Sequence, residues 1–390
     1  MNLGNKLSLL ALAMLFLFMV SCKEDMIEPT TPVETPPTAV ATQFSQINSW
    51  AYDVMKDAYF WSNVLPARRG LDSLANPKEY FEKLIYNRTT VDRFSGITDD
   101  IASMQKQFNG ISKIFGIQYQ LAFTDQTQSS IGLFLSYVVK GSPAEAAGLK
   151  RGDIVLKVNG QSLTNSNYAT LLRSGDNVSF TLGTLDGTNL VADNAKTFNL
   201  TKAEVTENPV GFSKVIDKPQ HGKKIGYLVY TGFVPGTGTS EKQFDNELRQ
   251  IFGDFKAQGV NELILDLRFN GGGYISSAET LASLIGKNIS SSKVFYKEQW
   301  NDAYTAYFKQ KNGPNALEHN FLNEPNNIGE NLNRVFVLTS NSTASASELV
   351  INGLKPYMNV VTIGNNTAGK NLFGTLIDDE QKRWNWGLYV

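Results

Sequence analysis

The stretch that decides the fold is Asn341-Ser342-Thr343-Ala344-Ser345-Ala346-Ser347-Glu348. An apolar, β-branched run at 335–339 precedes it, and a second apolar segment at 349–354 follows it. This order predicts a buried strand, a tight turn and a helix that begins at once. Ser345 is then expected at or near the first helical turn, among unpaired backbone N–H groups at the positive end of the helix dipole. A serine at such a place can also be only a helix cap, so its role depends on what lies downstream.

A second short strand is predicted at 359–364, and a glycine-punctuated loop at 365–370 follows it. Strand, helix and strand over this length form a βαβ unit, whose two strands are expected to be parallel neighbours about 4.8 Å apart. The loops at their carboxyl ends then lie side by side, with Ser345 in one and Lys370 in the other. A serine hydroxyl needs a base to take its proton, and a lysine amine shielded from water can serve. These residues therefore predict a dyad of Ser345 and Lys370.

An oxyanion-binding site is predicted at the same edge of the sheet. A third buried strand, at 262–268, ends in Asn270-Gly271-Gly272-Gly273, whose backbone N–H groups are unobstructed by side chains. Glycine-rich turns after strands also bind phosphates. This turn lacks the Gly-x-Gly-x-x-Gly spacing and the Gly-Lys-Ser/Thr ending, which argues against a nucleotide site.

Three segments in this order resemble the C-terminal processing (tail-specific) serine peptidases: Asp266-Leu267-Arg268-Phe269-Asn270-Gly271-Gly272-Gly273, Thr343-Ala344-Ser345-Ala346-Ser347-Glu348 and Thr367-Ala368-Gly369-Lys370. In that family the middle serine of a SASASE-like motif is the nucleophile, and the lysine of a later Gly-Lys motif is the general base. The resemblance covers most of the chain from about residue 44. It implies a multidomain α/β protein with a crotonase-like (ClpP/crotonase) catalytic core.

The oxyanion hole is expected to use the N–H groups of Gly272 or Gly273 together with that of Ala346. Two features depart from the family. The family often has a glutamine four residues after the lysine, which is thought to orient it, whereas this chain has Gly374. The chain also stops at Val390 within a predicted strand, 384–390, which leaves open whether the catalytic region is complete.

Length and composition limit the other possibilities. A chain of 390 residues with 42% apolar and 11% aromatic residues is expected to hold two or three domains with sizeable cores. The net charge of −1, without a basic tract, gives no indication of nucleic-acid binding. One cysteine and two histidines cannot form a Cys/His zinc cluster, and no cofactor is expected. His221 and His319 lie in a predicted turn and a polar loop, which disfavours a Ser-His-Asp triad.

The N-terminus has the pattern of an export signal. Residues 1–21 contain Lys6 and then an apolar stretch that is short for a membrane-spanning helix, which predicts a signal peptide. Met19-Val20-Ser21-Cys22 resembles a bacterial lipobox, which implies that Cys22 becomes the lipidated first residue of the mature protein. The alternative is an ordinary cysteine beside a membrane anchor. Residues 22–43, rich in Pro and Thr, predict an extended linker. We therefore expect a cell envelope lipoprotein, at the outer membrane and facing the periplasm or the cell surface.

Three domains are expected after the linker. Residues 44–100 carry apolar side chains at spacings of three and four, which predicts a small helical domain. Residues 101–204 change to short strands and turns and resemble a PDZ domain of bacterial proteases. Such domains bind extended C-terminal peptides by strand addition. The predicted peptide-binding residues are Ile131, Gly132 and Leu133, and the alternative is a PDZ fold with a structural role only. Residues 205–390 form the catalytic domain.

Three functions are compatible with these patterns. The leading one is an exported serine endopeptidase that cleaves protein substrates near their C-terminal tails, with the PDZ domain engaging the free C-terminus. The second is a catalytically inactive peptide-binding scaffold lipoprotein of the same fold, which Gly374 favours. The third is a crotonase-like acyl-CoA enzyme, which the PDZ domain and the export signal disfavour. The sequence does not indicate the oligomeric state.

Overall fold

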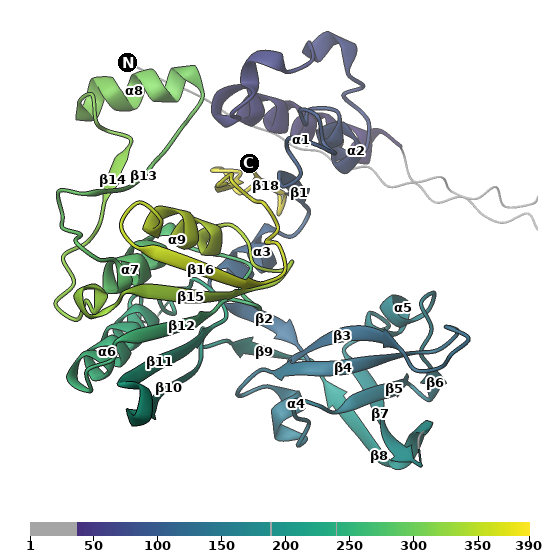
Figure 1. Ribbon diagram of the computed structural model, residues 1–390. Coiled ribbons are helices and arrows are strands. Elements are labelled where there is room, and N and C mark those ends of the chain that lie inside the picture. The colour runs from purple at the N-terminus through teal and green to yellow at the C-terminus, as the bar shows by residue number, and fades with distance from the viewer. Residues whose placement is uncertain (1–36, 188, 239) are drawn as a thin grey trace, which may run out of the picture.

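The computed structural model describes residues 37–390 except 188 and 239 (Figure 1). The predicted signal peptide, Cys22 and the first part of the predicted linker lie outside the described residues. The linker prediction of 22–43 needs a correction at its end, because helix α1 (Pro37–Ala58) begins within it. No helix in the described part of the chain is both long enough and apolar enough to cross a membrane.

The N-terminal unit is helical, as predicted. After α1 come two short 3-10 turns, Ser62–Val64 and Arg68–Gly70, and then α2 (Pro77–Glu82). Asn76 caps α2 by accepting a hydrogen bond from the N–H of Lys78, and Pro77 is in the first turn, where its missing N–H costs nothing. The predicted apolar stripe forms the core of this unit, which includes Ala51, Met55, Tyr59, Tyr80, Phe81 and Leu84.

The PDZ unit is built on a sheet with the strand order β3-β4-β5-β7-β8. These strands are β3 (Ile117–Phe123), β4 (Ile131–Val138), β5 (Ile154–Val158), β7 (Asn177–Asp186) and β8 (Asn189–Thr201), and β6 (Gln161–Ser162) pairs with β5. Two short helices, α4 (Pro143–Ala146) and α5 (Tyr168–Leu172), complete it. Asn159 and Gly160 both have positive φ (51° and 75°), as a tight hairpin turn requires.

Two further elements join the PDZ unit to the catalytic domain. Strands β2 (Ile111–Ile114) and β9 (Ala203–Thr206) pair antiparallel between the two domains (Figure 1). Helix α3 (Ile101–Phe108) comes first in the predicted PDZ segment, but it packs on the C-terminal end of the chain. The N–H of Ile101 donates to the carbonyl of Asn385 at 3.0 Å. The junction therefore lies against the catalytic domain rather than apart from it.

The catalytic domain is an α/β structure with the strand order β10-β11-β12-β15-β16. The strands are β10 (Val210–Lys218), β11 (Lys223–Tyr230), β12 (Glu262–Asp266), β15 (Arg334–Thr339) and β16 (Asn359–Gly364). All neighbours are parallel except β10 and β11. Helices α6 (Gln243–Ala257), α7 (Ile275–Ile285) and α9 (Ala346–Leu354) share one hydrophobic core with this sheet. The predicted βαβ unit is thus β15, α9 and β16.

The remaining elements flank this core. Helix α8 (Asp302–Asn312) lies near the hairpin of β13 (Val294–Lys297) and β14 (Glu318–Asn320), and 3-10 turns cover Pro219–His221 and Gly329–Asn331. Three short strands form the order β1-β18-β17: β1 (Gly96–Thr98), β17 (Leu376–Asp378) and β18 (Gly387–Tyr389). Leu388 of β18 is fully buried in the helical N-terminal core. This small sheet brings the C-terminal strand against both the helical unit and the catalytic domain.

Candidate active site

Ser345 occupies a sharp turn between β15 and α9. It is the residue that precedes the first turn of α9, and its φ of 58° and ψ of −116° are unusual for a non-glycine residue. Such a conformation costs about 1–3 kcal/mol and persists only where the surroundings hold it. The preceding residues do so, because the Thr343 hydroxyl donates to the carbonyl of Leu267 at 2.8 Å and the Ala344 N–H donates to that of Asn270 at 3.2 Å. The turn is therefore locked to the loop that follows β12.

Lys370 lies in the loop after β16, on the neighbouring parallel strand. Its amine donates a hydrogen bond to the hydroxyl of Tyr389 at 2.9 Å and faces the rings of Tyr389 and Phe94, at 4.8 Å and 5.4 Å from their centroids. Among the described residues, no hydrogen bond joins this amine to Ser345. The fold therefore brings the two predicted residues onto adjacent loops, and the lysine amine is bonded to a tyrosine.

The carboxylate of Glu348 connects the two loops. This buried side chain, 8% exposed, accepts the N–H of Ser345 and the N–H of Lys370, both at 2.8 Å from Oε2. Its Oε1 accepts the Thr367 hydroxyl at 2.6 Å and the Gly369 N–H at 2.8 Å. Sequence reasoning missed this role. The available signal was an acidic side chain three residues after the helix-capping position, where it can bond back to the N–H of the capping residue.

The glycine loop after β12 lies directly against Ser345. A Cβ added to Gly272 would stand 2.7 Å from the Cβ of Ser345 and 3.1 Å from the nitrogen of Ala346, so only glycine fits there. The N–H of Gly272 already donates to the side-chain oxygen of Asn270, at 2.9 Å. In the described part of the chain, the N–H groups of Gly273 and Ala346 donate to no acceptor. Of the three predicted oxyanion donors, these two are available to a ligand.

The glycine loop is shaped by the buried residues before it. The N–H of Arg268 and its guanidinium donate to the carboxylate of Asp266, with 2.6 Å between Nη2 and Oδ2. Burial acts to raise the pKa of Asp266, but hydrogen bonds from Arg268 and Tyr227 hold it below its usual value. Asn270, fully buried, donates to the carbonyl of Tyr230 at 3.0 Å. The motif that carried the family resemblance thus fixes the path of the backbone at the site.

Tyr389 explains the glycine at position 374. A Cβ added to Gly374 would lie 2.5 Å from the Cζ of Tyr389, so the tyrosine ring occupies the space of a side chain there. The ring also packs against Phe108 of α3, with 5.4 Å between centroids. The group that contacts the lysine amine therefore comes from β18, a segment that no motif marked.

The predicted peptide-binding residues of the PDZ unit need a correction. Ile131, Gly132 and Leu133 lie in β4, which pairs with β3 on one side and with β5 on the other. Because both edges of β4 are paired, it cannot accept an added strand, and the side chains of Ile131 and Leu133, 2% and 0% exposed, belong to the core. Among the described strands of this sheet, the open edge on that side is β3.

Neither histidine is near this arrangement. His319 lies in β14, where its ring stacks on Tyr296 with 4.5 Å between centroids and its Nε2 is 3.2 Å from a carboxylate oxygen of Glu298. His221 lies in the 3-10 turn before β11. Within the described residues, no group of three or more His, Cys, Asp or Glu side chains could hold a metal ion.

A PDZ unit joined to an α/β core, with a serine at the start of a helix and two unpaired N–H groups beside it, is the architecture of a serine peptidase class. The chain matches the profile of peptidase family S41 over residues 224–383, of the peptidase S41 N-terminal domain over 46–96, and of a PDZ domain over 134–184. The two S41 profiles together cover more than half of the chain. The chain belongs to peptidase family S41, as the sequence motifs predicted.

Individual relatives agree with this assignment. A carboxyl-terminal-processing protease of Synechocystis sp. is 24% identical over 322 residues, which are 77% of this chain and 66% of that protein. A carboxy-terminal processing protease of Bacillus subtilis is 30% identical over 243 residues, 61% of this chain and 44% of that protein. A Bacteroides fragilis crystal structure described as an S41 protease is 28% identical, with a TM-score of 0.69 over 87% of this chain and 83% of that one. The chain spans about half to two thirds of the length of the curated relatives it matches.

Proposed function

We propose that this chain is an exported serine endopeptidase that cleaves protein substrates near their C-terminal tails. The observation that carries the proposal is the carboxylate of Glu348, which bonds the backbone of Ser345 and the backbone of Lys370 at the same time. A serine that served only as a helix cap would not require hydrogen bonds that connect its turn to the loop with Lys370. Two unpaired N–H groups beside the same serine add the donors that an oxyanion requires.

In the proposed reaction, the Ser345 hydroxyl attacks the substrate carbonyl while the neutral amine of Lys370 takes its proton. The N–H groups of Gly273 and Ala346 stabilise the oxyanion, and the lysine then returns the proton to the leaving amine. A neutral amine has one lone pair and two N–H bonds. If one N–H donates to the Tyr389 hydroxyl, the lone pair remains free for the serine proton. We therefore assign Tyr389 as the residue that positions Lys370. Its ring fills the space that a side chain at position 374 would occupy.

Substitution of the dyad tests the mechanism. Ser345→Ala and Lys370→Ala should each abolish most peptidase activity, and the double variant should be scarcely less active than either single one, because the two residues act as a unit. His221→Ala and His319→Ala are the controls and should change kcat/KM little. Near-full activity in Lys370→Ala, with loss in a histidine variant, would rule out the Ser-Lys mechanism.

The positioning role of Tyr389 has a separate test. Tyr389→Phe keeps the ring that packs on Gly374 but removes the hydroxyl, so kcat should fall about tenfold while KM and the melting temperature change little. Tyr296→Phe removes a tyrosine hydroxyl whose partner is Glu279, away from Lys370, and is the matched control. An unchanged kcat in Tyr389→Phe would show that the hydroxyl does not position the lysine.

The alternative is a catalytically inactive peptide-binding scaffold of the same fold. It is favoured by the amine of Lys370, which bonds to Tyr389 and not to Ser345 among the described residues. An assay of peptide cleavage by the wild-type chain distinguishes the two functions. A scaffold binds peptides but cleaves none, whereas an endopeptidase cleaves them and loses cleavage on Ser345→Ala.

We further propose that the PDZ unit engages the free C-terminus of the substrate at the edge of β3. This strand exposes apolar side chains, with Leu121 40% and Phe123 45% exposed. Just before it, in the described chain, the N–H groups of Phe115 and Gly116 donate to no acceptor. An added strand would use the open edge, and the unpaired N–H groups could receive a terminal carboxylate.

Modified peptides test this binding mode on the Ser345→Ala chain, which cannot cleave them. A peptide with a free apolar C-terminus should bind more tightly than its amide. Methylation of the peptide nitrogens should weaken binding at alternate residues, because alternate N–H groups of an added strand face the sheet. Calorimetric titration measures both effects. Equal affinity of acid and amide, with no alternation, would indicate that the PDZ unit has a structural role only.

The signal-peptide and lipobox patterns lie outside the described residues, and we propose from them that the mature protein begins with a lipidated Cys22 in the cell envelope. Cys22→Ala should release the protein from membranes or block its processing. If that variant is processed normally and still sediments with membranes, the lipid anchor is wrong.

A further inference from the structure

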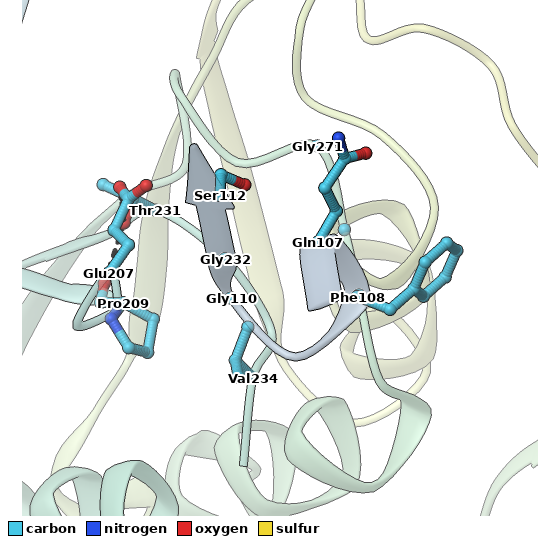
Figure 2. Close-up of a pocket in the computed structure, with 12 residues that line it drawn as sticks. Gln107, Phe108, Gly110, Ser112, Glu207, Pro209, Thr231, Gly232, Val234 and Gly271 are labelled. Atoms are coloured by element: carbon cyan, nitrogen blue, oxygen red, sulfur yellow. Dashed lines mark hydrogen bonds between the residues drawn. The ribbon is translucent and has the colours of Figure 1, made fainter. Parts of the chain in front are cut away.

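A cavity of about 320 Å³ lies between the glycine loop and the junction of the PDZ and catalytic units. One side is formed by Gly271, Gly272 and Gly273. Another is formed by Ser112 of β2 and by Glu207 and Pro209, which follow β9 (Figure 2). The end of α3, with Gln107 and Phe108, closes a third side. The cavity is therefore assembled from three segments that are far apart in sequence.

Among the described residues, Glu207 is the one charged residue that lines this cavity, and no basic side chain lines it. No ion pair with Glu207 is present among the described residues. Its carboxylate accepts a single hydrogen bond, from the Thr231 hydroxyl at 3.3 Å, and the same hydroxyl is equally close to the carbonyl of Pro209. Burial raises the pKa of the Glu207 carboxyl. The Glu207 side chain is half-buried, and its one hydrogen bond among the described residues is long and shared, so the carboxylate can accept a further donor.

The glycine loop that lines the cavity also contacts the proposed nucleophile, Ser345. Gly272 lines the cavity, and a Cβ on Gly272 would stand 2.7 Å from that of Ser345. Gly273, whose N–H is a proposed oxyanion donor, lines it as well. A peptide whose carbonyl is bound at that N–H would therefore lie along the glycine loop that lines the cavity. A lysine or arginine side chain that enters the cavity would bring a cationic group to pair with the carboxylate of Glu207.

We propose that this cavity is a substrate subsite that takes the side chain of a lysine or arginine within two residues of the scissile bond, with Glu207 as its counter-ion. This inference rests on the proposed peptidase function and adds to it a preference for cationic substrates. Gln107, Ser112 and Thr231 supply polar groups for the cationic end of such a side chain, and Phe108 and Val234 supply apolar contacts for its methylene groups.

A peptide library with every amino acid at each position tests the subsite. The library is incubated with the wild-type chain, Glu207→Gln and Glu207→Lys, and the products are mapped by mass spectrometry. Glu247→Gln is the matched control, because Glu247 is a half-buried acid that accepts a hydrogen bond from neighbouring Asn208 but does not line the cavity. The wild type and the control should favour Lys or Arg over norleucine about tenfold at one position. Glu207→Gln should lose this preference, and Glu207→Lys should favour Asp or Glu.

Cleavage without a cationic preference, or with a preference that Glu207→Gln retains, would overturn the subsite and leave the peptidase function standing. If the wild type cleaves nothing, the peptidase function fails, and binding decides the subsite. In that case N-acetyl-lysine methylamide and N-acetyl-norleucine methylamide are titrated into the wild type and Glu207→Gln and followed by NMR. Tighter binding of the lysine compound by the wild type alone supports the subsite, and equal binding of both compounds refutes it.

Discussion

The carboxylate of Glu348 is the constraint on which the site depends. Two oxygens receive four donors, from Ser345, Thr367, Gly369 and Lys370, inside the protein. Each charged hydrogen bond of this kind contributes about 1.5–3 kcal/mol, which is comparable to the strain stored in the backbone of Ser345. The carboxylate thus holds a strained turn and the loop with Lys370 in one arrangement. Glu348 itself lies in the first turn of α9, which is largely buried.

The segment that follows the helical N-terminal unit makes a second set of contacts at the site. Arg93, from the segment after the helical unit, donates to the carbonyls of Ala368 and Gly369 at 3.3 and 3.2 Å. Phe94 places its ring near the lysine amine, and β1 pairs with β18, which carries Tyr389. The surroundings of Lys370 therefore come from both ends of the described chain. This accounts for a helical unit that contributes no proposed catalytic residue yet shares a core with the last strand.

Much of this arrangement follows from local patterns in the sequence. The βαβ unit, the position of Ser345 before α9 and the loop with Lys370 were predicted because strand and helix periodicities are local, and parallel neighbours bring their carboxyl ends together. Tyr389 and Glu207 could not be found this way, because neither belongs to a motif. Tyr389 meets Lys370 only through the folding of the small sheet β1-β18-β17, and Glu207 lines a cavity assembled from three segments far apart in sequence. The predicted peptide-binding residues in β4 came from the resemblance to a PDZ domain, and only the observed strand pairing shows that the free edge on that side is β3.

The most direct test of the central claim is the reactivity of Ser345 toward a fluorophosphonate, which labels activated serines. The wild-type chain, Glu348→Gln and the exposed control Glu380→Gln are labelled, and the modified residue is identified by mass spectrometry. A glutamine at position 348 has one acceptor oxygen in place of two. Its NH₂ group would face N–H donors that now bond to the carboxylate, so some of these hydrogen bonds would be lost. The account predicts labelling of Ser345 in the wild type and the control, at a rate about tenfold or more lower in Glu348→Gln. An unlabelled Ser345 in the wild type, or a rate that Glu348→Gln does not change, would contradict it.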